Sequence, residues 1–154
     1  EVKDEEVVGF ILNKQLEYSL NDLYSSVTTE NTAVHSGGPV NQDNLYFIHN
    51  KPELIHNSLN FNEDLYWGGD FDHVIRLINK CELDSTCIKF FSGYTGWTLD
   101  QLSDEIKNDS WIIVDNKEKI EFKLNSDQLW GNYMKEMGSE FRIWSNAPEN
   151  PQSN

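Results

Sequence analysis

Short apolar runs without helical spacing recur along this chain and predict buried strands. Residues 7–12 and 88–91 are almost continuously apolar, which is typical of strands that are covered on both faces. Clusters of glycine, asparagine and proline separate such runs, as expected of turns. The same criterion predicts further strands that end near Val34 or cover residues 45–49, 65–67, 111–114 and 120–124.

Helical spacing is clearest after Asp70, a good N-cap residue. The apolar side chains that follow it are spaced by three and four positions, so they lie on one face of a helix. These side chains are Phe71, Val74, Ile75 and Ile78.

Other capping signals predict three more helices. Thr98 and Gln101 match a capping box, in which the hydroxyl and the amide each satisfy a free backbone N–H, for a helix that ends near Lys107. Ser19 caps a short helix in the same way. A longer helix is predicted from Ser126 to a stop at Gly138, because glycine favours the position after a helix end.

Interleaved strands and helices without a strict alternation predict an α+β fold, with a mixed sheet and flanking helices. The chain has 154 residues and no internal repeat, which favours one domain. We expect this domain to cover residues 1–146. Residues 147–154 contain two prolines and no apolar side chain after Ala147, which predicts an extended C-terminal tail.

The charge of the chain argues against direct nucleic-acid binding. Asp and Glu number 26 against 12 Lys and Arg, for a formal net charge of −14, which repels phosphate. Arg76 and Arg142 are the only guanidinium groups for bidentate contacts to bases.

Compartment signals predict a cytoplasmic protein that does not enter a membrane. No apolar run approaches the roughly 20 residues that a spanning helix needs, and no basic stretch followed by an apolar one opens the chain. Cys81 and Cys87 do not make a disulfide framework in a chain of this size. They are expected to be free, partly buried thiols.

The sequence contains no motif that predicts a catalytic or metal-binding site. The stretch 68–73, Gly-Gly-Asp-Phe-Asp-His, superficially resembles the signature of cyclic-dinucleotide synthases, yet a strand end followed by an N-cap explains Asp70. His35, His49, His56 and His73 lack the spacing of zinc ligands. No nucleophile–base pair, phosphate loop or dinucleotide fingerprint is present. We therefore expect no catalytic residues, no metal and no cofactor.

Two glycine-rich segments leave two interpretations open. Gly37-Gly38-Pro39 and the predicted loop from Gly93 to Trp97 present backbone N–H groups that either form an anion-binding nest or build a tight structural corner. The corner is favoured, because turns require glycine more often than ligands do.

These segments resemble the YqgE/AlgH family of bacterial proteins. The resemblance rests on residues 9–14 (Gly-Phe-Ile-Leu-Asn-Lys), on 37–40 (Gly-Gly-Pro-Val) and above all on the spacing of Gly93, Tyr94, Gly96, Trp97, Gln101, Leu102, Glu105 and Ile106. It departs from the family at Gln15, where a proline is usual, and at Leu99-Asp100, where Pro-Gly is common. Family members usually begin with a further stretch of strands, so the resemblance implies that an N-terminal portion of the domain is missing.

The resemblance implies an α+β fold with a curved mixed sheet, and leaves open whether this sheet closes like a barrel. It implies no established function, although some members are labelled transcriptional regulators. Together with the acidic composition, it favours a non-enzymatic cytosolic interaction or regulatory protein that acts on an unidentified protein partner. The expected binding surface consists of Asn13, Lys14, Gly37, Gly38, Pro39, Gly93, Tyr94, Gly96, Trp97, Gln101 and Glu105.

Two alternatives remain beside this hypothesis. The first is an enzyme or small-molecule binder, whose pocket lies between the Gly-Gly-Pro turn and the Tyr94–Trp97 segment, with Lys14 and Glu105 as its polar groups. The second is a transcriptional regulator that contacts DNA directly. The sequence does not fix the oligomeric state.

Overall fold

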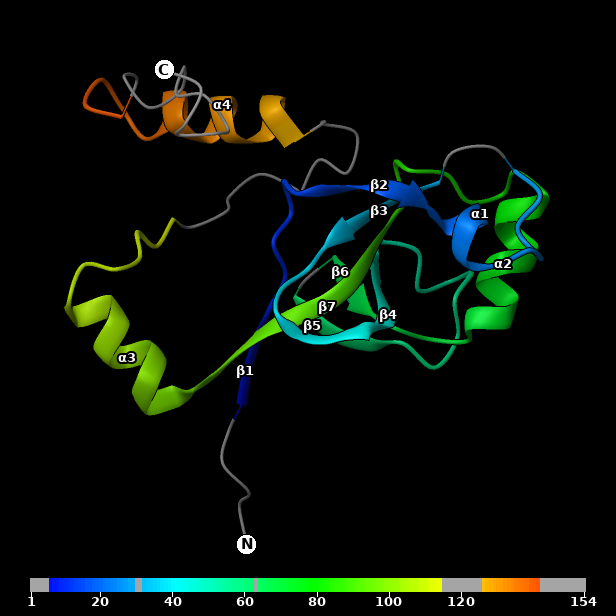
Figure 1. Ribbon diagram of the computed structural model, residues 1–154, viewed down its shortest axis with the longest axis horizontal. Coiled ribbons are helices and arrows are strands. Elements are labelled where there is room, and N and C mark those ends of the chain that lie inside the picture. Colours follow the sequence, from blue (N-terminus) through cyan, green and yellow to red (C-terminus); the bar gives the residue numbers. More distant parts are fainter. Residues whose placement is uncertain (1–5, 30–31, 63, 115–125, 142–154) are drawn as a thin grey trace, which may run out of the picture.

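The computed structural model describes residues 6–29, 32–62, 64–114 and 126–141, which form seven strands and four helices (Figure 1). The strands are β1 (Glu6–Gly9), β2 (Gln15–Ser19), β3 (Ala33–Ser36), β4 (Val40–His49), β5 (Leu59–Asn62), β6 (Leu65–Trp67) and β7 (Ile88–Thr98). The helices are α1 (Leu20–Leu23), α2 (Phe71–Asn79), α3 (Leu99–Lys107) and α4 (Ser126–Glu136).

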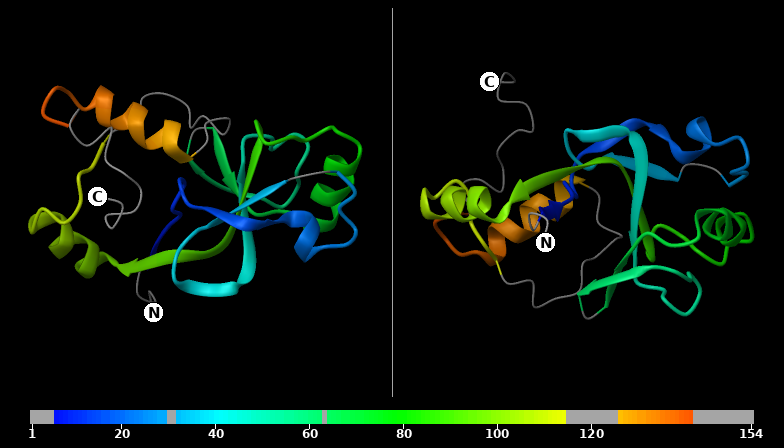
Figure 2. Two further views of the ribbon diagram at one scale, coloured as in Figure 1. Left: turned by 45° about the horizontal axis from the view of Figure 1, so that its top comes forward. Right: turned by 90° about the horizontal axis from the view of Figure 1, so that it is seen from below.

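The strands form one mixed sheet in the order β2-β3-β7-β4-β6-β5, and β1 pairs with the far half of β7. β3 and β7 run parallel, whereas the other pairs are antiparallel. This confirms the predicted α+β class. Within the described residues, the end strands β2 and β5 do not pair with each other, so the sheet is open and does not close into a barrel (Figure 2).

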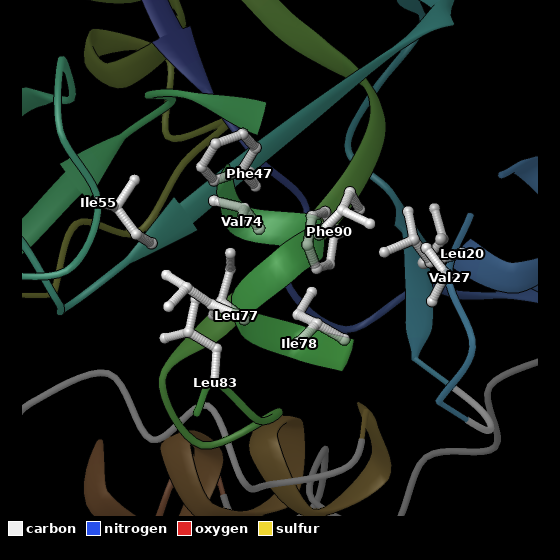
Figure 3. Close-up of a cluster of buried hydrophobic side chains, with 12 residues drawn as sticks. Leu20, Val27, Phe47, Ile55, Val74, Leu77, Ile78, Leu83 and Phe90 are labelled. Atoms are coloured by element: carbon white, nitrogen blue, oxygen red, sulfur yellow. The ribbon is translucent and has the colours of Figure 1, made fainter. Parts of the chain in front are cut away.

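Helix α2 covers one face of the sheet. Its side chains Val74, Leu77 and Ile78 pack with Phe47 of β4 and Phe90 of β7 in the main hydrophobic cluster (Figure 3). Burial of each such side chain contributes about 1.5–3 kcal/mol before the cost of ordering the chain. The helix spacing seen in the sequence is therefore confirmed.

Both capped helices begin where the sequence predicts. The carboxylate of Asp70 accepts a hydrogen bond from the backbone N–H of His73 at 2.9 Å, a cap that typically contributes about 1 kcal/mol. The hydroxyl of Thr98 accepts the N–H of Gln101 at 3.1 Å. The stretch 68–73 is thus a strand end and a helix cap, and Asp70 is occupied by the cap.

Strand β7 is buried on both faces in its first half, as predicted. Phe90 and Phe91 are neighbours that point to opposite faces, and neither is exposed to solvent. Phe91 belongs to a second cluster with Ile48 and Leu65, and Phe10 stacks on it with ring centroids 4.7 Å apart. The segment after β1 therefore covers the face of the sheet opposite to α2.

The predicted loop from Gly93 to Trp97 is wrong, because β7 continues through it to Thr98. Val40 of β4 pairs with Tyr94, and the whole of β1 pairs with residues 95–98. The second half of β7, paired with β1, extends away from the remaining strands and carries α3 at its end (Figure 1). The glycines at positions 93 and 96 therefore lie within a strand, where the first of them lets neighbouring backbone approach closely.

Three further predictions differ from the structure. The first strand is only β1, and none of its residues is fully buried, because its single strand partner is the projecting half of β7. Strand β2 occupies a stretch that showed no strand signal. Residues 111–114 are not a strand, and the predicted strand at 120–124 and the tail at 147–154 lie outside the described residues.

Both cysteines are free thiols, as predicted. Cys87 is half-buried, whereas Cys81 is exposed and not partly buried, because it follows the end of α2 with a positive φ of 58°. Within the described ranges, no helix combines the length and the apolar character that crossing a bilayer demands.

Candidate functional site

The two glycine segments of the expected binding surface pack directly against each other. The N–H of Gly37 donates to the carbonyl of Ser92 at 2.9 Å, and a Cβ atom on Gly37 would lie 2.2 Å from the carbonyl oxygen of Gly93. A Cβ atom on Gly38 would lie 2.3 Å from the carbonyl carbon of Tyr94. Backbone meets backbone here, which leaves no room for a ligand between the segments. This geometry supports the structural corner over the anion nest.

Asn13 and Lys14 lie in the exposed connection between β1 and β2. The carbonyl of Lys14 accepts the N–H of Ser36 at 2.7 Å, which places this connection beside the Gly-Gly-Pro turn. Pro39 is exposed next to it. Lys14 and Glu105 are both described, and they form no ion pair within 4.0 Å, so the polar pair of the proposed pocket is not assembled.

Glu105 is the centre of a hydrogen-bonded cluster at the tip of the projecting arm. Its Oε2 atom accepts the indole N–H of Trp97 at 3.0 Å and that of Trp111 at 2.6 Å. Its Oε1 atom accepts the amide of Gln101 at 2.9 Å. These donors, with Trp111 first, hold the pKa of the Glu105 carboxyl below its usual value. The carboxylate is therefore ionised at neutral pH and is used for structure.

The cluster explains the string of residues on which the family resemblance chiefly depends. Trp97 lies one residue before the end of β7, Gln101 and Glu105 lie one helical turn apart on α3, and Trp111 follows the helix. The amide of Gln101 bonds Glu105, while Thr98 keeps the cap. The sequence signalled Glu105 as part of the surface but gave no sign that it joins two indoles.

Several apolar side chains on α3 and in the segment directly after it are exposed to solvent. We call them together the α3 segment, which comprises Leu99, Ile106, Trp111, Ile112, Ile113 and Val114. Ile112 and Ile113 are 61% and 70% exposed, which is unusual for consecutive β-branched residues. Acidic side chains border it at Asp100, Asp104 and Asp109, all of them exposed. Sequence reasoning missed this surface because it interpreted residues 111–114 as a strand.

A second feature that sequence reasoning missed is a buried basic pair. His35 and Lys89 are each only 7% exposed, on the sheet face that carries Phe91. Lys89 Nζ donates to the carbonyl of Leu12 at 3.1 Å, whereas His35 Nδ1 has no partner. The pKa of His35 is lowered to about 4, mainly by burial and secondly by the positive charge of Lys89. Burial also lowers the pKa of Lys89.

The remaining histidines do not assemble a metal centre. The rings of His56 and His73 are 6.1 Å apart, and within the described part of the chain no three His, Cys, Asp or Glu side chains converge on one point. His49 is buried and bonds the carbonyl of Gly68 through Nε2 at 3.2 Å. Burial lowers its pKa, so it is neutral at physiological pH.

Comparison with known families identifies the chain. The family described as AlgH-like matches residues 1–142, which includes the glycine corner and the Glu105 cluster. The chain belongs to the AlgH-like family. The resemblance of the sequence to this family is thereby confirmed.

Relatives of this AlgH-like chain carry the name UPF0301 protein. One from Cytophaga hutchinsonii is 36% identical over 155 residues, covering 100% of this chain and 85% of the relative. One from Chlorobium limicola is 33% identical over 147 residues, covering 96% of this chain and 79% of the relative. Their names assign no activity.

Solved structures share the fold of this AlgH-like chain. A crystal structure of a protein from Corynebacterium diphtheriae superposes with a TM-score of 0.70 at 18% identity, covering 96% of this chain and 79% of the other. The solution structure of the AlgH protein from Pseudomonas aeruginosa superposes with a TM-score of 0.68 at 18% identity, covering 97% and 82%. At this identity the likeness extends to the fold alone.

Proposed function

We propose that this AlgH-like protein is a non-enzymatic interaction protein that binds a protein partner through the α3 segment. The observation that supports this most directly is the pair Ile112 and Ile113, which are exposed immediately after Trp111. Glu105 holds Trp111 through a 2.6 Å hydrogen bond, so the two isoleucines follow a fixed point of the chain. Apolar side chains held in solvent in this way favour burial against another protein.

The charge around the α3 segment suggests what the partner looks like. Asp100, Asp104 and Asp109 border this segment, and the whole chain carries −14. A partner segment with apolar residues flanked by lysine or arginine complements this surface, and the opposite charges accelerate encounter. Direct DNA contact is disfavoured by the same charge.

A location in the cytoplasm belongs to the same proposal. It is supported by the free thiols of Cys81 and Cys87, which fit a reducing compartment. The alternative of an enzyme with a pocket at the Gly-Gly-Pro turn has less support, because Gly37 and Gly38 leave no space against Gly93 and Tyr94.

Fluorescence anisotropy with a labelled synthetic peptide of alternating lysine and leucine residues tests this proposal. The intact chain should bind it saturably with one peptide per chain, and I112N/I113N should weaken binding by about tenfold, since a tenfold change corresponds to about 1.4 kcal/mol. Leu59→Asn is the matched control, because Leu59 is 64% exposed on β5, away from α3.

Three results would contradict the proposal. The first is equal binding by all three proteins, which would leave only nonspecific charge attraction. The second is self-association that I112N/I113N abolishes, which would make the surface a contact between copies of this chain. The third is tight binding of a labelled DNA duplex at physiological salt, which would favour a regulator that contacts DNA.

A further inference from the structure

A pocket with a volume of about 500 Å³ opens at the free edge of β4, at the end of β6 and the start of α2. This volume lies within the range of small-molecule sites, roughly 300–1,000 Å³. None of the residues expected to form the binding surface lines it, and it lies apart from the α3 segment. Its occupant is therefore a separate question from the partner proposed above.

Aromatic residues from both faces of the sheet line this pocket. Tyr24 and Phe71, with ring centroids 4.9 Å apart, lie on the α2 face, where Phe71 packs against the main hydrophobic cluster. Tyr46 and Trp67, with ring centroids 6.2 Å apart, lie on the opposite face, beside the ring of Phe10. Tyr24 follows α1 and is 37% exposed, so the wall includes a ring that solvent reaches. Aromatic rings have negative faces that attract cations, most strongly for tryptophan and tyrosine.

The charges of the lining point the same way. Asp43 is the one charged residue in the lining, and neither lysine nor arginine nor histidine contributes to it. Asp43 is exposed on β4 and is available as a counter-ion. A carboxylate in the same pocket as the rings of Tyr24 and Phe71 suits an organic cation, which the rings desolvate and the carboxylate neutralises.

An anion is a poor fit for the same space. Backbone amides close to the start of α2 would have to receive it, and two of them are already hydrogen-bonded within the protein. The N–H of Gly68 donates to the carbonyl of Phe47 at 2.9 Å, and the N–H of Asp70 donates to that of His56 at 3.1 Å. The Asp70 carboxylate caps the helix, which adds negative charge where an anion would approach.

We propose that this pocket binds an alkylammonium or guanidinium group on the α2 face of the sheet, against Tyr24 and Phe71, with Asp43 as counter-ion. Such a group belongs either to a free small cation or to a lysine or arginine side chain. If the group belongs to a polypeptide, the backbone of that polypeptide can pair with the strand edge beside the pocket. β6 pairs with β4 only at Ile48 and His49, so β6 does not cover the edge of β4 that precedes Phe47.

Titration of the ¹⁵N-labelled chain with choline tests the proposal by NMR. The backbone amides of Tyr24, Gly68 and Gly69 should shift saturably at concentrations up to about 20 mM, the range of a weak single-group site. The uncharged isostere 3,3-dimethylbutanol should bind at least about fivefold more weakly, because it has the shape of choline without the charge.

Substitutions test whether the Asp43 charge and the Tyr24 ring contribute to binding. Asp43→Asn and Tyr24→Leu change side chains that solvent reaches, so both should fold, and each should weaken choline binding by about three- to tenfold. Asp72→Asn removes the same charge from α2 outside the pocket lining and should change binding by less than about twofold. A second titration with Nα-acetyl-lysine-methylamide distinguishes the sources, since a backbone that pairs with β4 should also shift the amides of residues 43–46.

The proposal is overturned if the butanol binds as tightly as choline, which would make the pocket merely apolar. Equal effects of Asp43→Asn and Asp72→Asn would also overturn it, because the attraction would then come from the net charge. The absence of any shift at Tyr24, Gly68 and Gly69 with either cation would do so as well. Choline binding alone supports a free cation, and tighter binding of the lysine compound supports a polypeptide.

Discussion

The indole rings of Trp97 and Trp111 meet edge to face, with centroids 5.5 Å apart and planes at 85°, and both donate to one carboxylate oxygen. Trp97 lies near the end of β7, whereas Trp111 lies beyond α3. Their common acceptor, Glu105, therefore ties the chain after the helix back to the strand before it. The exposed isoleucines that follow begin from this fixed point.

Replacing Glu105 with glutamine should release Trp111. A neutral amide is a weaker acceptor than a carboxylate, and its single oxygen cannot serve two indoles and Gln101 as well. We expect a red shift of tryptophan emission and faster exchange of the Trp111 indole N–H, measured by fluorescence and NMR. Asp104→Asn is the control, because Asp104 is a neighbouring carboxylate that contacts Lys107 and neither tryptophan. Equal spectra for the two variants would contradict the cluster.

Acid should release the same cluster, but only at low pH. The pKa of Glu105 is lowered from 4.5 by Trp111, Gln101 and Trp97. Its hydrogen bonds are fully present above 4.5 and are lost as the pH falls through the lower pKa of the folded state. The indole N–H resonances of Trp97 and Trp111 should therefore keep their positions down to pH 4.5 and shift together below it. A shift between pH 6 and 5 would be inconsistent with the lowered pKa.

Gly37→Ala should destabilise the protein by about 2–3 kcal/mol, because a Cβ atom there meets backbone that cannot move without breaking the pairing around β7. That atom would lie 2.2 Å from the carbonyl oxygen of Gly93. Urea denaturation measures the change. Gly96→Ala is the control within the same motif, since its Cβ would meet only the ring of Tyr94 at 3.3 Å. Similar losses in both variants would contradict a backbone-packed corner.

Local signals in the sequence were sufficient for the helices and misleading for the long strand. Asp70 and Thr98 cap helices through their own neighbours, so the signal and the structure lie within four residues. The strand character of Gly93 depends on β4, and that of Gly96 on β1. A glycine that permits close packing has the same appearance in a sequence as one that permits a turn.

The candidate sites depend on contacts that no short pattern contains. Asp100, Asp104 and Glu105 all fit an acidic helix face, and only folding shows that Glu105 turns to Trp97 and Trp111. The pocket joins Tyr24, Asp43 and Trp67 from separate elements. Such convergence follows from the sheet order, which the sequence did not determine.

The buried His35 should make folding stability fall between pH 6.5 and about 4. Its pKa is about 4 in the folded protein against 6.5 in the unfolded chain, so the unfolded chain takes up a proton first as the pH falls. The loss should be about 2 kcal/mol between pH 7 and 4.5, and it should stop growing below about 4. Urea midpoints at several pH values measure it.

His35→Phe separates this effect from other titrations. Phenylalanine fits the contact with Phe91, whose ring lies 6.0 Å away, and it removes the unpartnered Nδ1. The contribution of His35 to the pH dependence in this window should disappear, while that of His49, whose pKa burial also lowers, should remain in both proteins. Identical pH profiles would show that His35 is solvated and protonates freely.

Lys89→Met should raise the pKa of His35 above 4 while leaving it below 6.5. Burial is the larger cause of the low value and stays, whereas the positive charge of Lys89 is the second cause and disappears. Methionine keeps the apolar stem of the lysine, at the cost of the hydrogen bond from Nζ to Leu12. NMR titration of the histidine ring protons measures the change, and Lys14→Met, an exposed lysine in the connection before β2, should leave it unaltered. If Lys89→Met leaves the pKa of His35 unchanged, the two side chains do not share one buried environment. If the pKa of His35 rises above 6.5, burial is not the main cause of its low value.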